Sequence, residues 1–320
     1  MQTILGAGGV IATELAKALT FYTKEIRLVS RTPEPVNETD EVLIADLTDY
    51  DQTLKAVTGS EVAYLTVGLP YDTKVWQKKW PVIMDNVIKA CLKARCKLVF
   101  FDNIYMYDGS NLNPITEETP INPPSEKGKV RARLVEMLWG AVKSKDLQAL
   151  IARSADFYGP GIQGSGLLNE TVIKPLSKGK KANWLMDYNY KHSFTYTVDA
   201  GKATALLGNT PDAFGQTWHL PTAKDPWTGK QWIEEIAKEM QVVPKFRRVG
   251  KSFVRFLGIF IPEMKESVEM LYQYDRDYVF NSDKFENKFS QRPTDYKTGV
   301  REVIAADYHK QRPAVSTSPK

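Results

Sequence analysis

The chain has 320 residues, of which 42% are hydrophobic and 25% are charged, and it carries a net charge of +5. Because this length is large for a single hydrophobic core, we expect one large domain with an appendage, or two domains. No apolar run approaches the roughly 18 residues of a membrane span, and the cations are dispersed among acids, so we expect a soluble protein with no membrane or nucleic-acid partner.

Cysteine and histidine are too scattered to indicate a metal site or a disulfide framework. Cys91 and Cys96 are five residues apart without a second pair of soft ligands, and His192, His219 and His309 follow no ligand spacing. We therefore predict two buried thiols, no metal and a reducing, cytoplasmic location. The chain begins almost inside the first expected strand, which we interpret as leaving no room for a signal peptide.

Residues 1–12, MQTILGAGGVIA, predict a strand, a tight glycine turn and the start of a helix. In such a turn, backbone N–H groups and the positive end of the helix can close on a pyrophosphate. A glycine triplet alone is weak evidence, because glycines occur in any tight turn, but a second apolar strand at 25–30 completes a βαβ unit. We therefore predict a dinucleotide contacted by the turn and the first helical residues, Gly6, Gly8, Gly9, Val10 and Ile11.

The residues after the second and third strands bear on which dinucleotide binds. An acid after the second strand would bind the ribose 2′-hydroxyl of NAD, whereas a cation can accept the 2′-phosphate of NADP. This chain has Ser30 and Arg31, which favours NADP over NAD, although a solvated loop arginine would look the same. A third strand at 42–45 leads to Asp46 and Leu47, where the carboxylate can accept from the adenine amino group or cap the next helix.

The next elements continue the alternation of strands and helices. A fourth strand at 61–67 runs into Val67 and Gly68, at the carboxyl edge of a parallel sheet, where ligands bind. A long helix at 73–94 then leads to a fifth strand at 97–101. The aromatic residues of that helix have helical spacing, which is typical of core packing.

A sixth strand at 147–153 carries the chain to the substrate side of the expected fold. We expect Asp156 and Tyr158 to lie near the nicotinamide. We expect His192 to lie in the part of the protein that faces the substrate. His192 could ligate or titrate, or it could simply hydrogen-bond a neighbour as a structural histidine.

Beyond these strands the chain changes character. The expected helices lie at about 168–179, 228–240 and 263–274, and short strands lie at 217–221 and 245–249. The apolar stretch at 252–261 is too short to span a bilayer and predicts a buried helix. The tail at 311–320 is rich in Ser, Thr and Pro, which predicts disorder.

Five short motifs occur in a fixed order along the chain: GAGGVIA at 6–12, Asp46-Leu47, Asp85 to Ile88, Phe157 to Gly161, and Thr195 to Gly201. In this order and spacing they resemble the extended form of the short-chain dehydrogenase/reductase superfamily, of the NAD-dependent epimerase/dehydratase type. The resemblance covers nearly the whole chain. It implies an α/β fold, a doubly wound Rossmann-type parallel sheet with a smaller C-terminal α+β substrate domain.

We place the domain boundaries accordingly. The dinucleotide-binding domain is expected at 1–165 plus 193–222, and the substrate-binding domain at 166–192 plus 223–310, followed by the disordered tail at 311–320. Members of the family often dimerise through the two long helices of the nucleotide domain, so the resemblance also implies a homodimer.

The catalytic positions depart from the family pattern. The family has a Ser or Thr after the fifth strand and a Tyr-x-x-x-Lys pair on the next long helix, where the lysine lowers the pKa of the tyrosine that passes the proton. Here Asn103 stands at the hydroxyl position, and Lys127 and Arg131 stand at the Tyr and Lys positions. Asn103 can hydrogen-bond a substrate oxygen but cannot relay a proton. Tyr105 offers a phenol from another direction, although tyrosines after strands are also common packing residues.

Lys127 and Arg131 are expected on one face of a helix that begins after Ser125, a good N-cap, because they are four residues apart. We expect both to point at the nicotinamide end of the cofactor, where two adjacent cations would let Lys127 exchange a proton near neutrality. Arg131 would hold the nicotinamide ribose or a carboxylate. The alternative for both residues is a solvated basic helix face, which is typical of charge runs.

These features predict an NAD(P)-dependent oxidoreductase or epimerase with a non-standard active site. Its substrate would be small and polar, such as a sugar, a carbonyl compound or a carboxylate. A non-catalytic NAD(P)-binding sensor or regulatory protein is the alternative, because it would keep the glycine turn while losing the catalytic hydroxyls.

Overall fold

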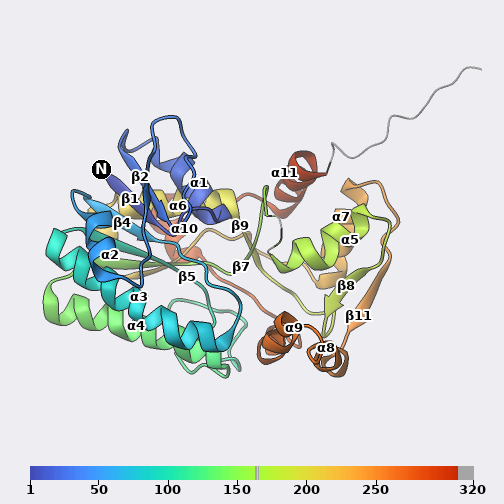
Figure 1. The fold of residues 1–320 in the computed structure, drawn as a ribbon. Helices are drawn as coiled ribbons and strands as arrows, with labels where there is room; N and C mark the ends of the chain where they lie inside the picture. The colour runs from blue at the N-terminus through green and yellow to red at the C-terminus, as the bar shows by residue number, and fades with distance from the viewer. Residues whose placement is uncertain (163, 165, 309–320) are drawn as a thin grey trace, which may run out of the picture.

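Seven parallel strands form one sheet in the order β10-β6-β5-β4-β1-β2-β3 (Figure 1). The computed structural model describes residues 1–162, 164 and 166–308, so the tail at 311–320 lies outside the described residues. The strands are β1 (Gln2–Leu5), β2 (Ile26–Ser30), β3 (Glu41–Ile44), β4 (Val62–Leu65), β5 (Lys97–Asp102), β6 (Ala149–Arg153) and β10 (Thr217–His219). This parallel sheet, with helices on both faces, confirms the predicted Rossmann-type fold class.

The helices bury one apolar face each against the sheet. One face is covered by α2 (Tyr50–Val57), α3 (Thr73–Ala94) and α4 (Glu126–Lys145), and the other by α1 (Val10–Leu19), α6 (Thr197–Gly208) and α10 (Asp283–Phe289). The side chains of Asp49, Asp72 and Ser125 accept backbone N–H groups in the first turns of α2, α3 and α4, which stabilises these helix starts. The predicted Ser125 cap is thereby confirmed.

A second group of elements lies beside the sheet (Figure 1). Two short parallel pairs belong to it, β7 (Asp156–Tyr158) with β9 (Phe194–Tyr196), and β8 (Ala182–Leu185) with β11 (Phe246–Val249). Its helices are η1 (Asn169–Ile173), α5 (Lys174–Ser177), α7 (Gly229–Glu239), α8 (Lys251–Leu257), α9 (Pro262–Ser267), η3 (Val268–Gln273) and α11 (Tyr296–Asp307). A separate aromatic core around Trp184, Trp232 and Tyr296 holds much of this group together. The residue boundaries expected between the two domains stay a prediction.

Three elements differ from the sequence expectations, and one is the helix expected at 263–274, which consists of α9 and the 3-10 helix η3. The helix expected at about 168–179 consists of a π-helical turn, η1, and the short helix α5. The stretch at 252–261 was expected to be a buried helix. It begins in helix α8, where Val254 is buried, but Phe256 and Phe260 are exposed. The helix has only seven residues, so it turns one narrow face to the core and leaves its other apolar side chains in solvent. In the part of the chain that the structure describes, no helix is long and apolar enough to cross a bilayer.

Candidate functional site

The glycine turn leaves open space above the end of β1. Gly6 has a φ of +106°, and a Cβ there would lie 2.5 Å from the backbone nitrogen of Val67, so a side chain would collide with the loop that follows β4. Gly8 also has a φ of +106°, but a Cβ at Gly8 or Gly9 would meet no atom within 4 Å. Gly6 therefore packs closely against Val67, whereas Gly8 and Gly9 face free space.

Helix α1 begins at the edge of this space. Its N-cap is Gly9, and no side chain caps its first N–H groups. Val10 is partly exposed, whereas Ile11 is buried in the core, so Ile11 can offer a ligand its backbone but not its side chain. Uncapped N–H groups at the positive end of a helix bind phosphate well, so the residues present fit the pyrophosphate of a dinucleotide.

The residues expected to select the dinucleotide lie after β2 and β3. Arg31 is exposed, and the Ser30 hydroxyl accepts the backbone N–H of Thr32 at 3.2 Å. Asp46 Oδ1 accepts both the backbone N–H and the hydroxyl of Thr48, at 2.9 and 2.8 Å. These bonds are the main reason that the pKa of Asp46 lies below its usual value, and the positive charge of Arg31 adds a small effect in the same direction.

One of the two expectations for Asp46 was that it caps the next helix, and this is wrong. The cap of α2 is Asp49, whose side chain accepts the backbone N–H of Gln52. Asp49 lies immediately before the first helical residue, which is the position where a cap must stand. Leu47 is buried, and its carbonyl accepts the side-chain amide of Asn86 at 3.0 Å. Helix α3 is thereby attached to the loop after β3.

Asn103 and Tyr105 form the loop that follows β5. The Asn103 Oδ1 accepts the backbone N–H of Tyr105 at 3.1 Å, so this oxygen holds the loop in place. The Tyr105 ring stacks on Trp76 with ring centres 6.3 Å apart. Burial and the nearby Asp156 carboxylate raise the pKa of Tyr105, while a hydrogen bond from Tyr71 opposes the rise. The Tyr105 phenol therefore stays protonated near neutrality.

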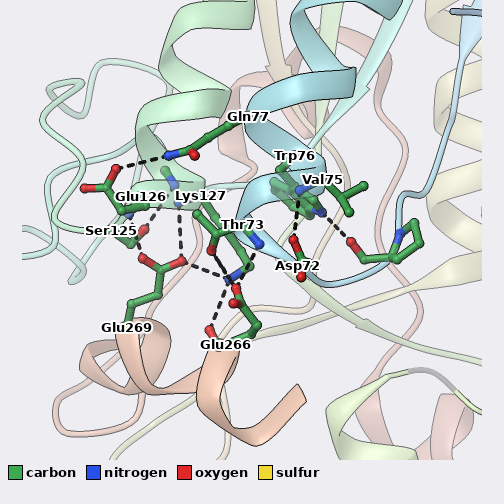
Figure 2. Close-up of polar contacts among 12 residues, drawn as sticks. Asp72, Thr73, Val75, Trp76, Gln77, Ser125, Glu126, Lys127, Glu266 and Glu269 are labelled. Carbon is green, nitrogen blue, oxygen red and sulfur yellow. Dashed lines mark hydrogen bonds and ion pairs between the residues drawn. The ribbon is translucent and has the colours of Figure 1, made fainter. Parts of the chain in front are cut away.

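Lys127 is enclosed by carboxylates from the other end of the chain. Its side chain is 0% exposed, and its Nζ lies 2.5 Å from Glu266 Oε2 and 3.0 Å from Glu269 Oε1. It also donates to the Thr73 hydroxyl at 2.9 Å. Figure 2 shows how these groups converge from α4, α3 and the α9–η3 segment (262–273). Glu269 additionally accepts the backbone N–H of Glu126, at the start of α4.

The pairing with Lys127 also affects Glu266. Although burial raises the pKa of this carboxyl, the hydrogen bonds from Lys127 and Thr73 outweigh burial and hold its pKa below the usual value. A buried ammonium ion needs such partners, because an unpaired charge away from water is very costly. The Lys127 charge is therefore fully compensated within the protein.

Arg131 lies one turn further along α4 and is also buried. Its Nε is 3.1 Å from Asp102 Oδ1, and its guanidinium group lies over the Trp80 ring at 4.5 Å. The other oxygen of Asp102 accepts from Arg153 at 3.1 Å. Burial lowers the pKa of Arg131, and the Asp102 carboxylate opposes this effect. Asp102 thus lies between two arginines.

Lys127 and Arg131 were expected to act on each other as two adjacent cations, and this expectation is corrected by the carboxylates that lie beside each of them. Each of them has its own carboxylate partners, as buried charges require. The solvated basic helix face is excluded for the same two residues, because both are buried.

Asp156 and His192 are brought together at the start of β7. Asp156 Oδ2 lies 3.0 Å from His192 Nε2 and accepts the Tyr274 hydroxyl at 2.5 Å. The His192 ring is stacked between Tyr274 and Tyr278, with ring centres 4.5 and 4.3 Å away. His192 is 2% exposed, whereas the Asp156 side chain is 20% exposed. The carboxylate is therefore the accessible member of the pair.

Tyr158 does not lie with them. It is 2% exposed and packs against Tyr196, Trp232 and Tyr296 in the core of the smaller group of elements. Its position two residues after Asp156 suggests a substrate contact, but its ring is buried in this core. Tyr158 is a packing residue.

Sequence reasoning missed the residues that complete the site. They are Tyr71, Glu266, Glu269, Tyr272, Tyr274 and Tyr278. The segment 272–278, YQYDRDY, is unusually dense in tyrosine and acid, and this composition was the available signal. The two glutamates carry no such signal, because Lys127 and its partners are more than 130 residues apart.

The sequence profile of the NAD dependent epimerase/dehydratase family matches residues 3–220. The chain belongs to this family. The NAD dependent epimerases and dehydratases are enzymes, so the match confirms the resemblance drawn from the motifs and the expectation of an enzyme. No curated protein matches the chain in sequence.

Solved structures share the fold of this family member over nearly its whole length. DesIV, a dTDP-glucose 4,6-dehydratase from Streptomyces venezuelae with NAD and TYD bound, is 14% identical, with 98% of both chains covered and a TM-score of 0.79. The UDP-glucose 4-epimerase from Thermus thermophilus in complex with NAD is 15% identical, with 96% of this chain and 98% of that chain covered and a TM-score of 0.77. At such identities the likeness establishes the fold.

Proposed function

We propose that the protein is an NAD(P)-dependent oxidoreductase or epimerase for a small polar, sugar-like or carbonyl substrate, in which Tyr105 and Asp156 replace the usual Tyr-x-x-x-Lys pair. One observation carries the proposal. The Asp156 carboxylate is partly exposed, is oriented by His192 and Tyr274, and lies close enough to Tyr105 to raise the pKa of its phenol. An oriented carboxylate beside a protonated phenol can serve as the base and the hydrogen-bond donor of a carbonyl–alcohol reaction.

The cofactor would lie across the open glycine turn, with its pyrophosphate at the start of α1. When bound, it supplies the hydride acceptor or donor. Gly8, Gly9 and Val10 would contact the phosphates, and Asp46 would face the adenine. We propose NADP rather than NAD, because the exposed Arg31 stands where a 2′-phosphate would need a cation.

The remaining residues have roles that follow from their contacts. Tyr105 stays protonated and would donate a hydrogen bond to a substrate oxygen, while Asp156 would accept the proton of a substrate hydroxyl or return it. Lys127 and Arg131 would position the surrounding elements rather than exchange protons, because carboxylates hold both of them. A sugar-like substrate is supported by the names of the similar structures, which are dTDP-glucose and UDP-glucose enzymes. The homodimer stays a prediction.

The proposal is tested by measuring hydride transfer with a panel of aldehydes, ketones and nucleotide sugars. The absorbance of the reduced nicotinamide reports the rate. We expect Asp156→Asn to lower the rate about 100-fold or more, and Tyr105→Phe about tenfold or more, because each removes one proton-transfer or hydrogen-bonding group. Tyr158→Phe is the matched control, since it removes a buried hydroxyl that has no hydrogen-bond partner among the described residues and should leave the rate unchanged.

Unchanged rates in both Asp156→Asn and Tyr105→Phe would refute this assignment. If the purified protein retains a dinucleotide but transfers no hydride with any member of the panel, the sensor alternative is favoured. Mass spectrometry of the retained nucleotide tests the cofactor, and NAD alone would refute the argument from Arg31.

A further inference from the structure

Helix α8 and the turn that follows it expose a patch of large apolar side chains. The exposed fractions are 43% for Phe253, 55% for Phe256, 73% for Ile259, 70% for Phe260 and 42% for Ile261. The Phe256 and Phe260 rings lie against each other, with centres 5.6 Å apart, so these two side chains form one continuous apolar surface, and the other three lie within three residues of them in sequence. Single apolar residues are common on protein surfaces, but a contiguous cluster usually marks a contact site.

The same part of the chain carries only positive charge. Between Gln241 and Pro262 there is no Asp or Glu, while five cations are present and exposed: Lys245, Arg247, Arg248, Lys251 and Arg255. The pairing of β11 with β8 adds Lys181, because the backbone N–H of its neighbour Ala182 donates to the Lys245 carbonyl at 2.8 Å. Glu266 and Glu269, on the next segment, are turned toward Lys127.

We propose that this tip segment, residues 245–261, binds the surface of an anionic lipid bilayer. The phenylalanine and isoleucine side chains would enter the headgroup region, and the surrounding lysines and arginines would contact the anionic headgroups. Helix α8 has seven residues, so the contact is peripheral and not a span. The sequence expectation of no membrane partner rested on the lack of a spanning segment, and it did not consider a surface contact.

The charge distribution distinguishes a bilayer from other occupants. In a symmetric contact with a second copy of this chain, the two sets of cations would face each other and repel. Protein interfaces are also depleted in lysine, and a protein partner would need a continuous acidic rim. An anionic bilayer complements both the apolar centre and the single sign of charge.

Co-sedimentation of the full chain with lipid vesicles tests the proposal. We expect binding to vesicles of phosphatidylcholine mixed with phosphatidylserine, little binding to phosphatidylcholine alone, and weaker binding as salt is raised, because salt screens the headgroup charge. Equal sedimentation with both vesicle types, or none with either, would overturn the proposal.

Two variants of the tip segment separate the contribution of apolar burial to vesicle binding from that of charge attraction. Ile259→Ser with Phe260→Ser should weaken binding about tenfold or more, through lost apolar burial. Lys251→Glu with Arg255→Glu should weaken it about 20-fold or more, through lost attraction and new repulsion. Since all four side chains are exposed, the melting temperature should not fall in either variant.

Matched controls come from exposed residues elsewhere on the surface. Phe21→Ser removes a phenylalanine that is 86% exposed, and Lys55→Glu with Lys93→Glu reverses two exposed lysines on α2 and α3. These controls should bind vesicles like the wild type, and equal losses in the controls and the tip variants would contradict the assignment to this surface. If the wild type is instead a dimer in light scattering and Ile259→Ser with Phe260→Ser makes it a monomer, the occupant is a second copy and the proposal is wrong.

Discussion

Replacing Lys127 with methionine should destabilise the protein strongly, and the cluster in Figure 2 provides the reason. Methionine has a similar length and fits an apolar environment, but it leaves Glu266 and Glu269 without their shared cation. Removing one partner of a fully buried ion pair costs about 3–5 kcal/mol. Because the two glutamates are 20% and 24% exposed, water can relieve part of the repulsion, so we expect a loss of about 2–3 kcal/mol.

Equilibrium denaturation in urea measures this loss, and α4 offers a matched control. Lys129 also pairs with a glutamate, Glu126, at 2.5 Å, but both side chains are at least half exposed. Exposed pairs contribute little, so Lys129→Met should leave the midpoint nearly unchanged. The double variant Lys127→Met with Glu266→Gln should regain part of the lost stability, because it removes one of the two unpaired charges.

The pH dependence gives an independent check. The pKa of Glu266 is lower in the folded state than in the unfolded chain, so its pairing stabilises the protein above the ordinary glutamate pKa of about 4.3. This contribution is lost as the pH falls through the lower, folded-state pKa. The difference in stability between wild type and Lys127→Met should therefore shrink below about pH 4. Equal urea midpoints for Lys127→Met and Lys129→Met at neutral pH would refute the reasoning.

Three further predictions follow from the nucleotide-binding part. Gly8→Ala should abolish dinucleotide retention, which mass spectrometry of the purified variant measures. Gly59→Ala should leave retention unchanged, although both glycines have a positive φ and open surroundings. Arg31→Ala should reduce the affinity for NADP about tenfold and leave that for NAD nearly unchanged in titration calorimetry. Gly201→Ala should lower stability by about 1–3 kcal/mol in urea denaturation, because its Cβ would lie 2.6 Å from the Glu14 carbonyl carbon.

The parts of the fold that depend on local sequence were predictable. The glycine turn, the Ser125 cap and the strand ends at Leu5 and Ser30 all follow from residue types within one element, and the structure places them within a residue or two of the expectations. The doubly wound parallel sheet then followed from the family resemblance, whereas its strand order came from the structure.

The candidate site was less predictable because its side chains meet through tertiary contacts. The partners of Lys127 lie 139 and 142 residues away, and no local pattern in 262–273 points to them. The exposure of Phe260 was missed for a related reason, since an apolar run predicts burial unless the neighbouring elements fail to cover it. Tyr158 was misplaced because a motif defines the path of the backbone but not the side to which a ring turns.

The enclosure of Lys127 has a consequence for attempts to restore the family's usual chemistry in this chain. Introducing a tyrosine at position 127 would not regenerate the family's proton donor, because Glu266 and Glu269 would face a phenol that cannot neutralise them. Lys127, which the motif alignment places at the family's tyrosine position, holds α4 to the α9–η3 segment through Glu266 and Glu269. A variant designed to place a phenol there would have to change at least the two glutamates together with Lys127, because Lys127→Tyr alone would leave both carboxylates without their cation.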